Sequence, residues 1–188
     1  MAAPVYAALV HHPVRARDGS VMTSAVTNVD VHDLARSART YGLAGYFVIS
    51  PIDAQRMVTE RILEHWRTGA GIRRVPERSE ALSRTHAVAS LEAASHHIET
   101  QTGQAPMWVV TEARPVGREI ISYAAARDAL ANATRPSLIL FGTAHGLHAD
   151  VIARAEVVIE PIAGVDSYNH LSVRAAAAIT FDRLFGAR

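Results

Sequence analysis

Short apolar runs alternate along the chain with longer segments of helical period. The apolar runs are mostly continuous, which is typical of parallel strands covered on both faces. These predicted strands are Val5–Val10, Gly45–Ser50, His86–Ala89, Met107–Thr111, Leu138–Phe141 and Val157–Glu160. The predicted helices between them are Val31–Tyr41, Ala54–Thr68, Leu91–Gln101, Tyr123–Ala131, Ala149–Ala155 and Ser172–Phe185. The pattern predicts an α/β fold with a mostly parallel six-stranded sheet and helices on both faces.

Several helix ends carry their own signals. Ser90 and Ser122 precede two of the predicted helices, and Gly103 and Gly186 follow two of them. The stretch Thr68–Arg84 has no clear period and is expected to be an extended irregular surface segment. No internal repeat or long linker divides the 188 residues, so a single domain spanning 1–188 is expected.

Composition excludes several kinds of chemistry. The chain has no cysteine, which rules out disulfides, thiolate metal sites and cysteine nucleophiles. Every basic residue other than histidine is arginine, so there is no lysine for a Walker-type phosphate loop or a Schiff base. No apolar run approaches the roughly 20 residues of a membrane span, and Met1–Leu9 lacks a basic start. A cytoplasmic protein without a membrane partner is expected.

The ends of the predicted strands show where a ligand would lie, since open α/β sheets bind ligands beyond the carboxyl ends of their strands. His11, His12 and Pro13 follow the first strand, and the dinucleotide fingerprint G-x-G-x-x-G is absent after every strand. Glycine and other small residues follow the last three strands, which suggests close approach of backbone to a ligand.

These residues carry a resemblance. The ordered segments "LILFGTAHGL", "VIEPIAG" and "YNHLSVRAAAAI" resemble the C-terminal region of the SPOUT (α/β-knot) class of S-adenosylmethionine (SAM)-dependent RNA methyltransferases. The N-terminal "ALVHHPV" and "TNVDVHDLARSARTYGLAGYFVISP" resemble a bacterial RNA methyltransferase family of that class. The resemblance implies a C-terminal trefoil knot over about 107–188, SAM as cofactor, RNA (tRNA or rRNA) as substrate and a homodimer.

The resemblance also implies positions for the cofactor and the catalytic groups. Backbone loops would hold SAM, and Ile162, Leu171 and Ala176 would supply an apolar slot for adenine. The cofactor residues expected on this basis are Thr111, Glu112, Ala113, Gly142, Thr143, Gly146, Glu160, Pro161, Ile162, Asn169, Leu171 and Ser172. Arg36 matches the arginine of the first SPOUT motif, and Asp166 is the first candidate for the base that removes a proton from the acceptor.

Other residues are candidates for contacts with the RNA. Asn28 and Asp30 are expected just before the first helix, and Arg39 lies one turn after Arg36. Arg73 and Arg74 belong to the main concentration of arginines, which suits phosphate contact, although nearby glutamates also make a solvated face plausible. Asp30 and Glu112 are rivals of Asp166 as the base.

Two further expectations limit the chemistry. The absence of cysteine excludes pyrimidine C-5 methylation through a cysteine adduct and leaves a ring nitrogen or a ribose 2′-oxygen as acceptor. The chain has Ala144 and His145 where many SPOUT members carry a glutamate, which puts ribose specificity in doubt. The histidines lack the H-E-x-x-H spacing, so no metal is expected.

Two alternative functions stay open at this point. One is a non-catalytic protein that binds SAM or a nucleotide for regulation. The other is a Rossmann- or flavodoxin-like oxidoreductase, which the missing glycine fingerprint disfavours. The role of the polar stretch Asp166–His170 also stays open. It can act as a helix cap, as a wall of a ligand site, or as both.

Overall fold

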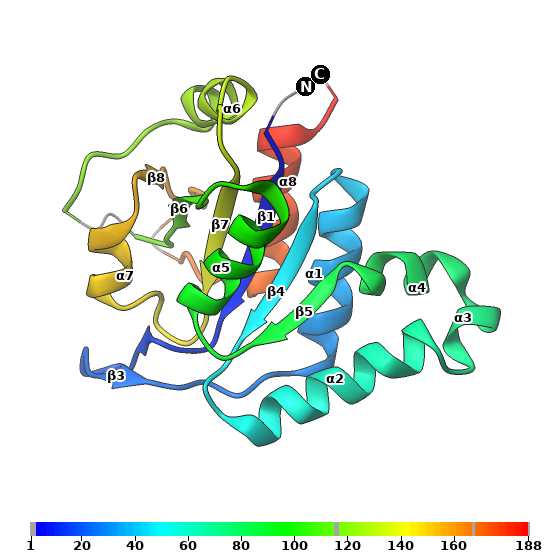
Figure 1. Ribbon diagram of the computed structural model, residues 1–188. Helices are drawn as coiled ribbons and strands as arrows, with labels where there is room; N and C mark the ends of the chain where they lie inside the picture. The colour runs from blue at the N-terminus through cyan, green and yellow to red at the C-terminus, as the bar shows by residue number, and fades with distance from the viewer. Residues whose placement is uncertain (1–2, 115–116, 167, 188) are drawn as a thin grey trace.

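A computed structural model describes residues 3–114, 117–166 and 168–187 (Figure 1). Its centre is a six-stranded sheet in the order β5-β4-β1-β7-β6-β8, and all of its pairings are parallel. The strands are β1 (Val5–Val10), β4 (Gly45–Ile49), β5 (Thr85–Val88), β6 (Met107–Thr111), β7 (Ser137–Gly142) and β8 (Val157–Ile159). The predicted α/β class with a parallel six-stranded sheet is confirmed, and the strand bounds differ from the predicted ones by one residue at most.

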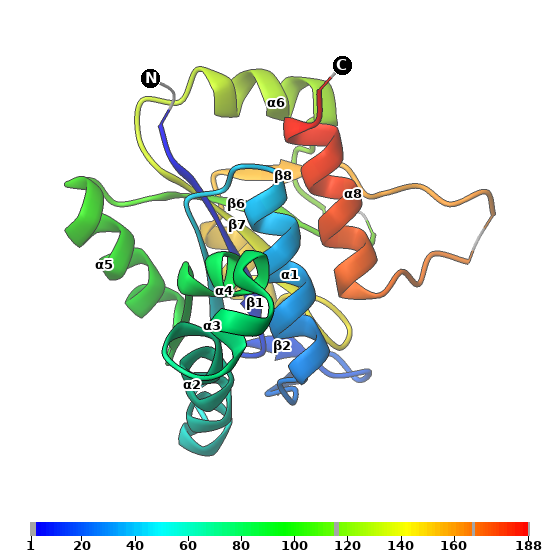
Figure 2. The same ribbon diagram turned by 90° about the vertical axis from the view of Figure 1, so that its right-hand side faces the viewer.

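Helices cover both faces of the sheet (Figure 2). On one face, α1 (Asn28–Thr40), α2 (Asp53–Arg67), α6 (Tyr123–Ala131) and α8 (Val173–Phe185) contribute buried side chains to a core around Leu34, Ile139 and Phe181. On the other face, α5 (Leu91–Thr102) and α7 (Ala149–Arg154) form a core around Phe47, Ile98 and Leu140. Burial on both faces is why the strands read as continuous apolar runs.

The register places the carboxyl ends of the strands next to one another. Val10 at the end of β1 pairs with Gly142 of β7 and with Ile49 of β4. Thr111 at the end of β6 pairs with Phe141 of β7 and with Ile159 of β8. The loops that follow these strands therefore start from one edge of the sheet.

The helix ends follow the sequence signals closely. Ser90, Ser122 and Ser172 are N-caps, and the hydroxyl of each accepts a backbone N–H three residues further on. Gly103 is the left-handed C-cap of α5, with φ 79°.

The start of the first helix differs from the prediction. Thr27 is the N-cap of α1, and its hydroxyl accepts from the N–H of Asp30. The expectation that Asn28 and Asp30 precede the helix is therefore wrong, because both belong to its first turn. The apolar period begins only at Val31, so the polar first turn gave no periodic signal.

The stretch 68–84 is not irregular, contrary to expectation. It contains the helices α3 (Gly71–Arg74) and α4 (Pro76–Ser83). With α2 they form an arm beside α1 (Figures 1 and 2). Leu82 of α4 is fully buried, and the Arg78 guanidinium lies 5.1 Å from the centroid of the Trp66 ring. Tertiary packing stabilises segments that are too short to form helices by themselves.

A small hairpin was also missed. β2 (Val14–Arg15) and β3 (Val21–Met22) pair in antiparallel orientation beside the main sheet. Two residues per strand are too few for a recognisable period.

Candidate functional site

A cavity of about 710 Å³ opens at the carboxyl edge of the sheet. Its walls come from the segments after β1, β6, β7 and β8 and from the first turns of α8. The volume is in the range of small-molecule and cofactor sites. Many of the residues expected to bind the cofactor or the substrate line it, namely Asp30, Thr111, Glu112, Ala113, Gly142, Thr143, Gly146, Ile162, Asn169 and Leu171.

The loop from Gly142 to Leu147, called the glycine loop below, requires its glycines. A Cβ on Gly142 would lie 2.7 Å from the backbone N of Leu147. Gly146 has φ +99°, and a Cβ there would lie 2.5 Å from Oε2 of Glu112. The glycines thus allow a tight turn that places backbone at the wall of the cavity.

Glu112 fixes the glycine loop from the end of β6. One of its carboxylate oxygens accepts the Leu147 N–H at 2.7 Å, and the other lies 3.0 Å from Nη2 of Arg15. Only 4% of the Glu112 side chain is exposed. Burial raises the pKa of Glu112, while the Leu147 N–H and the Arg15 guanidinium oppose that rise. Both oxygens are engaged, so the geometry favours a structural clamp over a free base.

The β2–β3 hairpin forms a wall of the cavity that the sequence did not predict. The backbone N–H of Arg15 donates to Gly146 O at 2.9 Å, and the N–H of His145 donates to Arg15 O at 3.2 Å. These bonds join the hairpin to the glycine loop. Arg15, Arg17 and Gly19 of the hairpin line the cavity, and no motif in the sequence marked them.

A short chain of polar side chains crosses the base of the cavity. His11, which follows β1, is fully buried, and its Nδ1 lies 2.8 Å from the Ser24 hydroxyl. Ser24 in turn contacts the hydroxyl of Thr143 in the glycine loop. Burial lowers the pKa of His11 to about 4, against an opposing effect of Asp30. His11 is therefore neutral at physiological pH.

Another part of the cavity wall is more apolar. Phe141, Ile162, Val173 and Ala176 line it, next to the hydroxyl of Thr180. Small side chains at the start of α8 give this part of the cavity an apolar wall, as an adenine ring requires. The predicted slot residues Ile162, Leu171 and Ala176 are brought together here.

The segment between β8 and α8 closes the cavity with few contacts. The side-chain amide of Asn169 donates to Ala113 O at 3.0 Å, which links this segment to the loop after β6. Asp166 accepts the N–H of Tyr168 at 2.8 Å, is exposed and does not line the cavity. Ser172 caps α8, while Asn169 and Leu171 face the cavity, so this stretch serves as cap and as wall.

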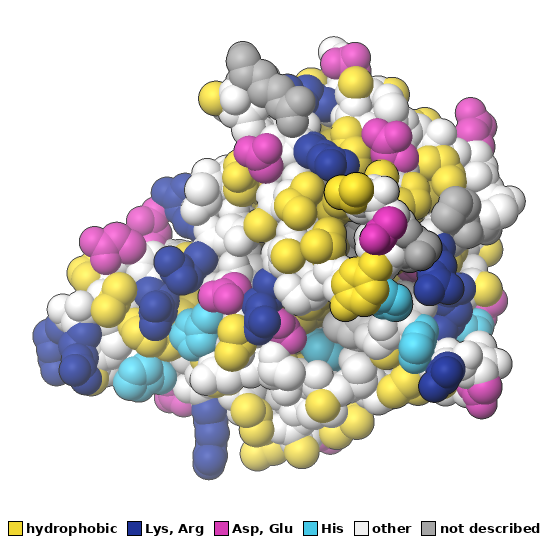
Figure 3. Space-filling view, turned by 180° about the vertical axis from the view of Figure 1, so that it is seen from behind, with side chains coloured by type: hydrophobic (Ala, Val, Ile, Leu, Met, Phe, Trp, Pro, Cys, Tyr) yellow, Lys and Arg dark blue, Asp and Glu magenta, His cyan; other side chains and the backbone are white. Residues whose placement is uncertain are grey.

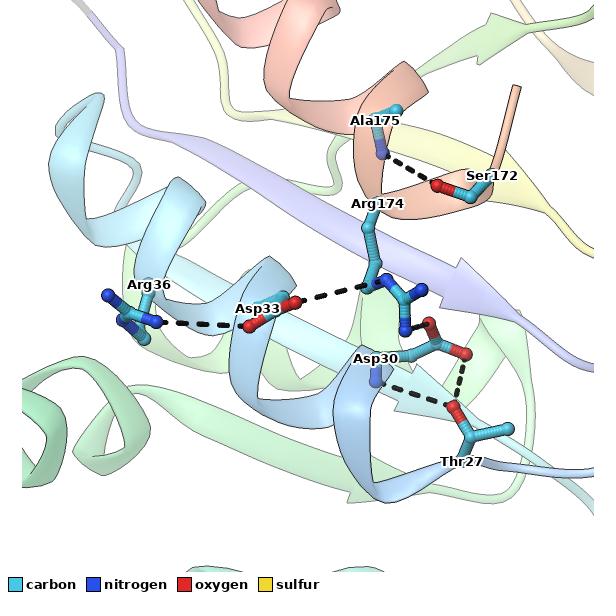
Figure 4. A network of polar contacts seen from close by, with 7 residues as sticks. All are labelled: Thr27, Asp30, Asp33, Arg36, Ser172, Arg174 and Ala175. Carbon is cyan, nitrogen blue, oxygen red and sulfur yellow. Dashed lines mark hydrogen bonds and ion pairs between the residues drawn. The ribbon is translucent and has the colours of Figure 1, made fainter.

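The candidate Arg36 also lies outside the cavity. It is exposed on α1, and its nearest ion-pair contact is Asp33 at 3.9 Å. In Figure 4 it points away from the ion pair of Asp30 and Arg174, whose atoms are 3.4 Å apart. That pair joins the first turn of α1 to α8 and leaves Asp30, unlike Arg36, at the cavity wall.

The other candidates are dispersed. Glu160 accepts the Tyr123 N–H at 2.9 Å and lines a second cavity of about 350 Å³ at the start of α6. Arg39 pairs with Glu80 of the arm, at 2.8 Å between Nε and Oε1. Arg73 and Arg74 are exposed on α3, and basic side chains are visible at this end of the arm in Figure 3. Pro161, Ser172 and Asn28 are outside the lining of the large cavity.

The structure gives two further negative findings for the described residues. Within them, no group of three or more His, Asp or Glu side chains is placed to hold a metal ion. None of the helices in this part of the chain is long and apolar enough to cross a membrane.

A parallel α/β sheet with a glycine loop and a cavity at its carboxyl edge is the arrangement in which open α/β proteins bind ligands. Known structures share this fold. TrmJ from Z. mobilis aligns with a TM-score of 0.66 at 15% identity, covering 100% of this chain and 70% of TrmJ. The SpoU methyltransferase AviRb from Streptomyces viridochromogenes, solved with AdoMet, aligns with a TM-score of 0.59 at 15% identity, over 98% of this chain and 58% of AviRb.

The chain belongs to a family of SAM-dependent RNA methyltransferases, whose family model matches residues 4–186. It is 42% identical over 182 residues to a tRNA (guanine-N(1)-)-methyltransferase of Oleidesulfovibrio alaskensis, which covers 97% of this chain and 42% of that protein. It is 37% identical over 181 residues to an uncharacterized protein of Aquifex aeolicus, covering 96% and 88%. The chain thus spans less than half the length of the first of these relatives. Membership confirms the expected resemblance to SAM-dependent RNA methyltransferases.

Proposed function

We propose that this chain transfers a methyl group from SAM to RNA, with SAM bound in the large cavity. The observation that carries the proposal is the glycine loop at the cavity wall, because Gly142 packs against Leu147 and Gly146 packs against Glu112 with no room for a side chain at either position. SAM supplies an electrophilic methyl on its sulfonium. The protein then has to hold the donor and orient the acceptor.

The two sides of the cavity suit the two ends of SAM. The apolar side, with Ile162, Leu171 and Ala176, would take the adenosine. Backbone groups of Thr111–Ala113 and of the glycine loop would bind its polar edges and the methionine part. Glu160, Pro161 and Ser172 lie beside this lining and would support it rather than contact the cofactor.

The proposed substrate is RNA, with tRNA first and rRNA second. The name of the Oleidesulfovibrio relative supports tRNA, but the chain matches only 42% of that protein, so its guanine-N1 activity can reside in the unmatched part. We keep a ring nitrogen and a ribose 2′-oxygen as the two acceptor classes. The RNA backbone would contact polar side chains outside the cavity. These are the exposed Asn28, Arg73 and Arg74 and the half-buried Arg39.

We further propose that the chain works as a homodimer with a knotted C-terminus in the cytoplasm. Arg36 and Asp166 lie outside the cavity of their own chain, and Val165, Tyr168 and Leu171 are exposed apolar or aromatic side chains in the segment before α8. A second chain seated on this surface would cover them and could place Arg36 or Asp166 at a reacting group. Light scattering coupled to gel filtration measures the mass and overturns the dimer if only monomer is present.

The test of the activity combines binding and transfer. Calorimetry with SAM should give binding to one site per chain. Incubation of bulk tRNA and of rRNA with methyl-labelled SAM, followed by mass spectrometry of the nucleosides, should identify one methylated nucleoside. SAM binding without label in either RNA pool would contradict the enzyme and support the alternative of a non-catalytic SAM-binding regulator.

A further inference from the structure

His11 is a buried polar side chain that the cofactor site does not explain. It follows the central strand β1, where Val10 is flanked by Gly142 of β7 and Ile49 of β4. The residue has no exposed surface, yet it lines the large cavity. Its Nδ1 is hydrogen-bonded to Ser24, whereas its Nε2 has no hydrogen-bond partner among the described residues.

The donor and acceptor of each hydrogen bond between His11, Ser24 and Thr143 follow from the bond that Thr143 makes to a backbone carbonyl. The Thr143 hydroxyl lies 3.0 Å from Val10 O, and a carbonyl oxygen only accepts, so Thr143 donates there. Its single hydrogen is then used, and the bond between Ser24 and Thr143 must be donated by Ser24. Ser24 has no hydrogen left, so it accepts from His11, and the His11 proton is on Nδ1.

The protonation state of Nε2 follows directly. Burial lowers the pKa of His11 to about 4, so the ring is neutral and carries one proton. Because that proton is on Nδ1, Nε2 presents an unshared electron pair. Buried polar atoms in proteins are nearly always hydrogen-bonded, so this acceptor requires a donor.

The neighbouring charged groups do not supply that donor. Asp30, whose carboxylate acts electrostatically on His11, is itself an acceptor and pairs with Arg174. The Arg15 guanidinium at the cavity wall pairs with Glu112 through Nη2, and its Nε, like the Tyr46 hydroxyl, is a buried donor that makes no hydrogen bond to Nε2 of His11. A molecule with an N–H or O–H group that enters the cavity can supply the missing partner.

We propose that Nε2 of His11 accepts a hydrogen bond from the N–H or O–H group of the RNA nucleotide that receives the methyl, and so orients that group. This inference rests on the proposed function. Both acceptor classes, a ring nitrogen and a ribose hydroxyl, can carry such a hydrogen. His11 follows β1, which lies between β4 and β7, and so it sits beside the glycine loop and one strand further from the cofactor loops that follow β6 and β8. The donor hydrogens of SAM are the other source of the same chemistry, and the experiment separates the two.

The first arm of the experiment is spectroscopic and needs no activity. Nitrogen-15 NMR of the histidine rings, with His11 assigned from the His11→Asn variant, should show the proton on Nδ1 in the free protein. S-adenosylhomocysteine should leave the Nε2 resonance nearly unchanged, and adding bulk tRNA should move it upfield as Nε2 accepts a hydrogen bond.

The second arm uses two substitutions of His11, each of which retains the hydrogen-bonding group at one of the two ring nitrogens. Asparagine places its amide near Nδ1 and can still donate to Ser24, whereas glutamine places its amide near Nε2 and can accept there. SAM affinity should stay within about twofold in His11→Asn, which keeps the bond to Ser24. The ratio kcat/KM for RNA should fall about tenfold or more in His11→Asn, and His11→Gln should recover part of it. His12→Asn is the matched control, because His12 contacts Thr23 at 3.0 Å and does not line the cavity.

The contrary outcomes are distinct. A proton on Nε2 in the free protein, an Nε2 shift produced fully by S-adenosylhomocysteine, or no shift with either probe overturns the inference. So does a higher kcat/KM for RNA in His11→Asn than in His11→Gln, which would mean that His11 only holds Ser24. Failure of the proposed function looks different, because wild-type protein would then methylate no RNA while the NMR arm still reports on contact with tRNA.

Discussion

The glycine loop (142–147) and the segment before α8 (162–166 and 168–171) both contribute residues to the wall of one cavity, and they are held in very different ways. Glu112 accepts the N–H of Leu147, Arg15 bonds to Gly146, and Thr143 bonds to Val10. In the segment before α8, the described side-chain bond to the rest of the fold is that of Asn169 with Ala113 O. Val165 and Tyr168 there are 107% and 73% exposed.

This difference indicates how the site is organised. The glycine-loop wall is formed before any ligand arrives, so binding there costs little ordering entropy. The segment before α8 presents apolar surface to water and would gain contacts from a ligand or from a second chain. Four predictions test the contrast, in decreasing order of expected effect.

The largest effect is expected for Gly146→Ala. The new Cβ would meet both Glu112 and Arg15 in a backbone with φ +99°, so the glycine loop must shift. We expect a loss of about 3 kcal/mol in the free energy of unfolding and loss of SAM binding, measured by denaturant titration and calorimetry. Gly19→Ala is the control, because Gly19 has φ +87° but nothing within 4 Å of its Cβ, and it should cost about 1 kcal/mol. An equal loss of stability in Gly146→Ala and Gly19→Ala would contradict close packing of the glycine loop against Glu112.

Acid should destabilise the side chains that hold the glycine loop. Burial lowers the pKa of His11 to about 4, while an unfolded histidine titrates near its ordinary 6.5. Between these values the unfolded chain binds more protons, so the stability present above pH 6.5 falls as the pH drops toward 4. The contribution of His11 is about 3 kcal/mol at most. Unfolding measured from pH 7 to pH 4 should show a shallower fall in His11→Asn, and an identical fall would contradict the assignment.

Glu112→Gln should have a smaller effect. Glutamine can still accept the Leu147 N–H but leaves Arg15 without its counter-charge. We expect a loss of about 2 kcal/mol of stability and weaker SAM binding, measured by thermal unfolding and calorimetry. Glu92→Gln removes the exposed pair with Arg154 and should cost no more than about 0.5 kcal/mol. An equal loss of stability in the two variants would mean that burial does not strengthen the interaction of Glu112 with Arg15.

The smallest effect on stability is expected in the segment before α8. Asn169→Ala removes the bond to Ala113 O from a partly exposed side chain, so stability should change by under about 0.5 kcal/mol while SAM affinity falls about fivefold. Asn132→Ala, which removes a bond within the end of α6, serves as the control and should leave SAM affinity unchanged. Unchanged affinity in Asn169→Ala would mean that this segment is not a wall of the cofactor site.

Much of the fold was predictable because periodicity reports burial directly. The predicted bounds are correct for Val5–Val10, Met107–Thr111 and Tyr123–Ala131. Each capping serine forms a hydrogen bond to the backbone only three positions further along the chain. The helices of the arm were not predictable, because α3 and α4 have 4 and 8 residues and depend on packing against α1 and α2. The β2–β3 hairpin escaped for the same reason of length.

The candidate site divides in a similar way. The sequence by itself determined the glycines after β7, the small residues of α8 and Ser172 as a cap, since each is a property of one short segment. Only the tertiary structure decided that His11 and Arg15 line the cavity, that Glu112 is clamped, and that Arg36 and Asp166 lie outside it. Those outcomes depend on contacts such as Arg15 with Glu112, 97 residues apart, and Ser24 with Thr143, 119 residues apart. Local periodicity describes which face a residue takes within its element, whereas partners across the sheet are set by strand order and register.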